Sequence, residues 1–153
     1  MGHPHSPHQR NLKWDIYSKK SPKQVLSTPF WSRPGQFGPW SQAIRVPAGH
    51  DLIFTTGMTA RDEQGNTVAP GDAKAQARRI FEQLRAILAE GGATLADVVQ
   101  MTVYVHTMDD VLAIQEVRNE YWPSAPPASA TVQVARLVSD AVRLEVQAVA
   151  VVP

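Results

Sequence analysis

The chain has 153 residues, 43% of them hydrophobic, which suits a single domain with an ordinary buried core. Its formal net charge is +1 and its acidic and basic residues are intermixed, so it carries no electrostatic footprint for nucleic acid or a membrane surface. It has no cysteine, which excludes disulfides, thiolate nucleophiles and cysteine metal sites.

Residues 1–37 read as an N-terminal arm, separate from the domain expected over residues 38–153. Prolines recur throughout the arm and forbid a long helix. The first ten residues are expected to be disordered, but the segment that follows is too apolar for a free tail. We therefore interpret the arm as an irregular segment that packs on the body or on a neighbouring subunit. Its aromatic residues Trp14, Phe30 and Trp31 are candidates to close over a binding cleft.

The first half of the body predicts two strands and a helix. The strands cover residues 41–46 and 51–58, and a loop with turn signals covers 61–71. Asp72 is a favourable N-cap for the helix that follows, and the Gly91-Gly92 pair is expected to end it. The apolar residues that recur at helical spacing between them are Ala77, Ile80, Phe81, Leu84, Ile87 and Leu88.

The second half predicts a strand, a helix and two more strands. Residues 98–106 alternate as in a half-buried strand, and Asp109 or Asp110 is expected to cap the next helix. That helix carries its apolar stripe on Val111, Ile114, Val117 and Tyr121. Strands over 130–137 and 141–152 complete the order ββ-α-β-α-ββ. This order indicates an α+β fold, a mixed sheet covered on one face by two helices.

The last strand shows that the second sheet face also needs cover. Val142, Leu144, Val146, Ala148 and Ala150 lie on one of its faces. The opposite row also contains apolar residues, among them Val149 and Val151. Because the chain has only two helices, the second face is most simply covered by another copy of the chain.

Several familiar sites can be set aside. His3, His5 and His8 lie in the terminal segment without a carboxylate or cysteine set, so no metal site is expected. The glycines fit neither a GxGxxG motif nor a P-loop, and there is no GxSxG elbow. The tryptophans are interpreted as packing residues because no basic stripe accompanies them. No apolar run approaches the roughly 20 residues of a membrane span, and the N-terminus lacks a signal-peptide core, so we expect a cytoplasmic protein.

From Gly38 to Val152 the chain resembles the reactive intermediate deaminase family, also called RidA/YjgF. The family's opening GPYSQAI is similar to GPWSQAI here, and its strand LIFTSGQIP is similar to DLIFTTGMTA. Its pattern of helix, glycine pair and strand matches the segment GDAKAQARRIFEQLRAILAEGGATLADVVQMTVYVHTMDD of this chain. The end of its second helix matches EVRNEYW. Its closing strands VEVARL and IEIEAIAV resemble VQVARL and LEVQAVAV.

This resemblance implies a chorismate-mutase-like fold and a homotrimer with sites in clefts between subunits. Typical members hydrolyse imines and enamines, such as 2-aminoacrylate, to a keto acid and ammonia, with neither metal nor organic cofactor. An arginine grips the substrate carboxylate through two parallel hydrogen bonds. A glutamate near the end of the last strand positions or activates the water.

Matching the motifs position by position places the expected site. The family's arginine falls on Ser129 and its late glutamate falls on Gln147, which are the two candidate catalytic positions. The remaining candidate substrate-binding positions are Trp40, Thr56, Gly57, Met58, Gln115 and Thr131. Serine cannot make the bidentate ion pair, and glutamine can orient water but cannot act as a base at neutral pH.

These departures predict a neutral cleft that binds a small, planar, largely apolar molecule, with weak or absent hydrolysis of 2-aminoacrylate. A replacement cation could come from Arg61, Arg136 or Arg143, although Arg136 belongs to the ordinary VARL pattern. Two functions remain open. One is an atypical enzyme that acts on an imine, an enamine or a similarly labile molecule. The other is a non-catalytic trimer that binds or senses a small ligand.

Overall fold

A computed structural model describes residues 20–29 and 40–153 of the chain. Its strands are β1 (Gln24–Leu26), β2 (Ala43–Arg45), β3 (Leu52–Phe54), β4 (Val98–Val105), β5 (Ala128–Gln133) and β6 (Leu144–Val151). Its helices are α2 (Ala73–Glu90) and α3 (Val111–Tyr121), with short 3-10 turns at Leu95–Asp97 and Met108–Asp110. The predictions for Trp14, Phe30, Trp31 and the terminal histidines concern residues outside the described ranges.

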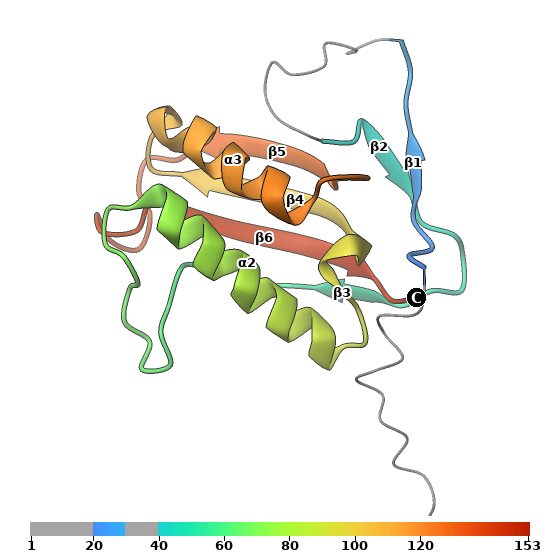
Figure 1. Cartoon of the computed structure of the whole chain (residues 1–153), viewed down its shortest axis with the longest axis horizontal. Coiled ribbons are helices and arrows are strands. Elements are labelled where there is room, and N and C mark those ends of the chain that lie inside the picture. Colours follow the sequence, from blue (N-terminus) through green and yellow to red (C-terminus); the bar gives the residue numbers. More distant parts are fainter. Residues whose placement is uncertain (1–19, 30–39) are drawn as a thin grey trace, which may run out of the picture.

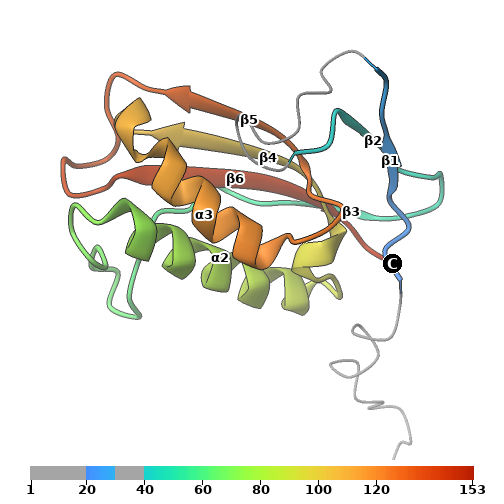
Figure 2. The same ribbon diagram turned by 45° about the horizontal axis from the view of Figure 1, so that its top comes forward.

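Four strands form one mixed sheet in the order β3-β6-β4-β5. β4 and β5 are parallel, and β6 runs antiparallel to both β3 and β4. Parallel strands need a crossover connection, and α2 and α3 provide the crossovers from β3 to β4 and from β4 to β5. Both helices lie on the same face of the sheet (Figures 1 and 2). The predicted α+β fold with two helices on a mixed sheet is confirmed.

All but one of the predicted strands differ by more than one residue from their predicted extent: β2 and β3 are shorter than the predicted 41–46 and 51–58, and the last two strands have shifted bounds. β5 covers Ala128–Gln133 rather than 130–137, and β6 begins at Leu144 rather than at 141. The reason is the sheet itself, since β5 has β4 as its neighbour and β4 ends at Val105. The final ladder bond runs from Val134 N to Val105 O at 3.1 Å, and the chain then leaves the sheet. β5 and β6 do not pair, because β4 lies between them.

The helix boundaries follow their local signals with one exception. Asp72 caps α2 by accepting a hydrogen bond from Ala75 N at 3.0 Å, and Gly92 leaves the helix with φ of 80°. Asp110 stands at the N-cap of α3 but makes no side-chain capping bond. Its carboxylate instead accepts from Arg143 at 2.8 Å. Asp110, one of the two predicted alternatives, is therefore the N-cap residue, but the ion pair with Arg143 rather than a capping bond occupies its side chain.

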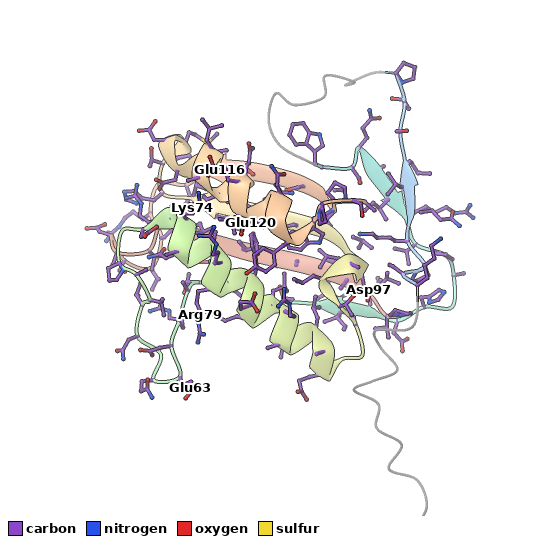
Figure 3. The ribbon with its side chains drawn as sticks, viewed as in Figure 1. Glu63, Lys74, Arg79, Asp97, Glu116 and Glu120 are labelled. Atoms are coloured by element: carbon purple, nitrogen blue, oxygen red, sulfur yellow. The ribbon has the colours of Figure 1, made fainter. Side chains whose placement is uncertain are left out.

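The two helices run parallel and pack through both charged and aromatic contacts. Lys74 pairs with Glu116 at 2.6 Å, and one turn further on Arg78 pairs with Glu120 at 2.7 Å. Figure 3 shows Lys74 on α2 beside Glu116 and Glu120 on α3. These exposed pairs contribute little to stability. The stronger contact is a buried aromatic cluster in which the rings of Phe81 and Trp122 meet edge to face at 5.1 Å.

The described part of the arm contains a strand that was not predicted. β1 pairs antiparallel with β2, with Val25 opposite Ile44. Lys23 anchors this segment to the body by donating to Val98 O at 3.0 Å and to Ala125 O at 2.8 Å. A short strand such as β1 depends on a partner distant in sequence, so the proline-rich composition of the arm did not reveal it.

The sheet face opposite the helices is partly apolar and uncovered in a single chain. Leu52 and Phe54 on β3 are 44% and 72% exposed, and Val132 on β5 is 43% exposed. Leu52 and Phe54 pair with Val151 and Val149 of β6, so these side chains share a face. Within residues 20–29 and 40–153, no helix has the length and apolar character needed to span a membrane.

Candidate functional site

A cavity of about 310 Å³ lies between the edge strand β5 and helix α3. Its lining residues are Trp40, Met108, Val111, Gln115, Arg118, Ser129 and Thr131. Ser129 and Thr131 point to the helix side because they pair with Met101 and Val103, whose side chains are fully buried. The cavity thus brings together four of the residues predicted from the family motifs: Trp40, Gln115, Ser129 and Thr131.

Trp40 is placed beside β5 by the residue that follows it. Ser41 forms a parallel bridge with Ala128, and its N–H donates to Pro127 O at 3.1 Å. The Ser41 hydroxyl also donates to Pro126 O at 2.5 Å. A second hollow of about 330 Å³ adjoins the first and shares Trp40 and Ser129 with it. The indole therefore contributes to the walls of two adjoining spaces at the edge of the sheet.

The hydroxyl of Ser129 is a buried polar group at the wall of the cavity. Its Oγ is buried and has no hydrogen-bond partner within the part of the chain that the structure describes. A buried hydroxyl without a partner costs free energy, and such groups in native structures call for an explanation. A bound ligand that accepts or donates a hydrogen bond in the cavity would remove this cost.

Arg118 is the functional candidate that the sequence interpretation missed. It lines the cavity from α3 and is only 2% exposed. Burial lowers the pKa of Arg118 to about 10, so the guanidinium remains protonated at neutral pH. Among the described lining residues, Arg118 therefore contributes a positive charge that the prediction of a neutral cleft did not include.

A sequence signal for Arg118 did exist. Its spacing from Ile114 and from Tyr121 is that of neighbours on one helix face, so it belongs to the buried stripe of α3. An arginine on such a stripe is uncommon, since charged residues are rarely fully buried. Because the other residues of the stripe are apolar, the ordinary interpretation of the stripe is a packing surface, which does not single out the charged residue within it.

The three arginines proposed as replacement cations do not line this cavity. Arg61 donates to Thr59 Oγ1 and to Thr67 Oγ1, each at 2.9 Å, and so organises its own loop. Arg143 is paired with Asp110. Arg136 is exposed on the connection that follows β5.

The other predicted residues form a second group, away from the cavity. Met58 bridges to Val146 through two backbone hydrogen bonds of 2.8 and 2.9 Å, and Thr56 and Gly57 precede it. Gln147 is exposed and pairs with Thr102. Its neighbours Val146 and Ala148 are buried, so Gln147 lies on the sheet face opposite the helices. Within one chain, Ser129 and Gln147 are thus on opposite faces of the sheet.

Gly57 brings a carboxylate into this second group. A Cβ at this position would lie 2.8 Å from Cδ of Glu145, closer than such atoms approach, so a side chain here would force the Glu145 carboxylate to shift. Glu145 stands two residues before Gln147 on the same face of β6. The face that lost the family's late glutamate therefore still carries an acid nearby. Across residues 20–29 and 40–153, no three His, Cys, Asp or Glu side chains gather where they could hold a metal ion.

Comparison with known proteins agrees with these features. Residues 30–152 match the profile of the family described as Endoribonuclease L-PSP. A RutC family protein of Pyrococcus abyssi is 37% identical over 135 residues, which cover 88% of this chain and 94% of that protein. A protein of Dermatophagoides farinae named 2-iminobutanoate/2-iminopropanoate deaminase is 31% identical over 132 residues, which cover 86% and 98%.

Among solved structures, the Rid-family protein YyfB of Yersinia pestis superposes with a TM-score of 0.74. It is 26% identical in sequence, and the match covers 84% of this chain and 98% of YyfB. The motif resemblance, the matched profile and the shared fold agree. The chain belongs to the Endoribonuclease L-PSP family, which is the reactive intermediate deaminase (RidA/YjgF) family that its motifs resemble.

Proposed function

We propose that this protein is an atypical deaminase of its family that hydrolyses a small imine or the enamine from which it forms. Water adds to the carbon of the C=N bond, the C–N bond breaks, and the products are a carbonyl compound and ammonia. The observation that carries the proposal is the cavity that unites Trp40, Gln115, Ser129 and Thr131 with a buried cation. The deaminase name of the Dermatophagoides farinae relative supports the reaction class.

We further propose a homotrimer in which each site is shared by two copies. The Ser129 cavity and the Gln147 group lie on opposite sheet faces of one chain, so each group alone is half of the expected site. Because the two half-sites lie on opposite faces of one chain, a complete site forms only where one half-site meets the other half-site of a second copy. The exposed apolar side chains of Leu52, Phe54 and Val132 supply a surface for that association.

In this arrangement one half-site holds the substrate and the other activates the water. Trp40 gives a flat apolar wall for a planar substrate, while Ser129 and Thr131 offer hydroxyl hydrogen bonds. Gln147 of a neighbouring copy orients the attacking water through its amide. Glu145, on the same face, accepts the proton that the water loses.

The direct test is ammonia release from 2-iminopropanoate generated in the assay by an amino-acid oxidase. We expect hydrolysis above the spontaneous rate, in contrast to the weak or absent hydrolysis predicted from Ser129, because Arg118 supplies a cation to the cavity. A double variant with Ser129→Ala and Thr131→Ala should lose this activity. Hydrolysis at the spontaneous rate, together with saturable binding of the keto-acid product, would contradict the proposal. That pair of results would favour the alternative of a non-catalytic trimer that binds a small ligand.

A further inference from the structure

We propose that Arg118 is the anion-recognition residue of the cavity and that the ligand it selects is a small carboxylate with a planar 2-imino or 2-oxo group. The reaction class rests on the proposed function, but the carboxylate site rests on Arg118 itself. In the family pattern that the motifs resemble, the arginine stands on the strand. In this chain the strand position is Ser129, and the cation comes from α3 into the same cavity.

The composition of the cavity supports an anionic ligand. Of the described residues that line it, Arg118 is charged and none is acidic. The remaining polar groups are the amide of Gln115 and the hydroxyls of Ser129 and Thr131. A guanidinium has five N–H donors, so it can serve its protein neighbours and still present donors to a ligand. A volume of about 310 Å³ matches a small molecule.

The burial of Arg118 supports a role beyond packing. Removal of a guanidinium from water disfavours its charged form, and its pKa is lowered to about 10 for that reason. Val111 and Ile114 on the same stripe are buried and show that an aliphatic side chain satisfies the packing of α3. A perturbed charged group that lines a cavity is a candidate for function.

Ser129 supplies a second, independent observation. Its buried Oγ has no hydrogen-bond partner among residues 20–29 and 40–153, and it lines the same cavity as Arg118. A carboxylate accepts up to four hydrogen bonds on two oxygens, so it could take donors from both side chains. One anion would then satisfy the Ser129 hydroxyl and contact the Arg118 guanidinium together.

The experiment measures binding of pyruvate and of its neutral isostere pyruvamide to the full-length protein by NMR titration. We expect the wild type to prefer pyruvate and Arg118→Gln to lose the preference, with the Kd for pyruvate raised roughly 10- to 100-fold. Arg118→Lys should keep part of the preference, since it retains charge without the planar fork. Arg136→Gln, which removes an exposed arginine outside the cavity, serves as the matched control and should bind like the wild type.

A relocation variant sharpens the test. Arg118→Gln combined with Ser129→Arg moves the cation from the helix to the strand and should recover most of the pyruvate preference. A folded Arg118→Gln variant that still prefers pyruvate would overturn the proposal. If that variant fails to fold, ligand binding to the wild type is the test. Equal affinity of the wild type for pyruvate and pyruvamide, or no binding of either, also overturns the proposal.

Failure of this inference can be told apart from failure of the proposed function. Pyruvate binding that depends on Arg118 without ammonia release upholds the carboxylate site and contradicts the hydrolase. Ammonia release that is unchanged in Arg118→Gln upholds the hydrolase and contradicts the role of Arg118.

Discussion

Gly57 and Glu145 show how one backbone position controls the placement of the carboxylate proposed as the general base. The missing side chain of Gly57 leaves space that the carboxylate of Glu145 occupies. Glu145 is half-buried and stands on the same face of β6 as Gln147. The amide of Gln147 can hold a water molecule but cannot take its proton, so the proposed reaction needs a base close to it. Glu145 is the acid that the structure places there.

We predict that Glu145→Gln lowers kcat for 2-iminopropanoate hydrolysis by roughly 10²–10⁴-fold, the usual contribution of a general base. The substitution keeps the shape of the side chain, so thermal unfolding should change little. Gly57→Ala is its steric counterpart, because the added methyl displaces the Glu145 carboxylate without changing its chemistry. A Glu145→Gln variant with wild-type kcat would show that the proton goes elsewhere.

At the scale of elements, the helices were predictable and the strand partners were not. The caps and stripe of α2 depend on residues within a few positions of one another, so Asp72 and the glycine pair were sufficient. The length of β5 depends on where β4 ends, and β1 depends on β2, which lies further along the chain. These are pairings distant in sequence, which a local pattern does not encode.

The same distinction holds for the candidate site. Family motifs identified Trp40, Gln115, Ser129 and Thr131, and the structure brings them together in one cavity. They could not show that Gln147 lies on the opposite sheet face, because that follows from the register between β4 and β6. Arg118 was missed because its charge interrupts an otherwise apolar stripe, where packing is the ordinary interpretation.

The anchor of β1 gives an element-scale prediction that depends on pH. Burial lowers the pKa of Lys23 from its ordinary 10.5 to about 8, and the charge of Asp97 partly offsets this. Between pH 8 and 10.5 the unfolded chain therefore binds more protons at this residue than the folded chain does. The contribution of Lys23 to stability rises with pH through this window and is constant below it.

We predict that Lys23→Met exposes residues 20–29 to limited proteolysis, because the two bonds to Val98 O and Ala125 O are lost. In urea unfolding at equal protein concentration, the free energy of unfolding of the wild type should also rise relative to that of the variant between pH 8 and pH 10. A stability difference that is constant over this range would mean that Lys23 titrates normally in the folded protein.

In the whole molecule, the two faces of the sheet differ in how well they are covered. The helix-side face is filled by a continuous core that includes Phe81, Met101 and Leu144. The other face exposes Phe54 at 72% and Leu52 at 44%, in register with Val149 and Val151 of β6. Apolar side chains that are contiguous on one face, unlike isolated ones, indicate an association surface. That face also carries Gln147, so association and completion of the site would be one event.

We predict a trimer with a mass of about three times 16.8 kDa in light scattering at micromolar concentration. Phe54→Asp places a charge on the apolar face and should shift the protein toward monomer, with loss of ammonia release at the same time. Leu112→Asp is a matched control, because Leu112 is 73% exposed, almost as Phe54 is, but lies on α3 across the sheet. It should leave both mass and activity unchanged. A monodisperse monomer that hydrolyses 2-iminopropanoate would contradict the shared site, since one chain would then suffice for catalysis.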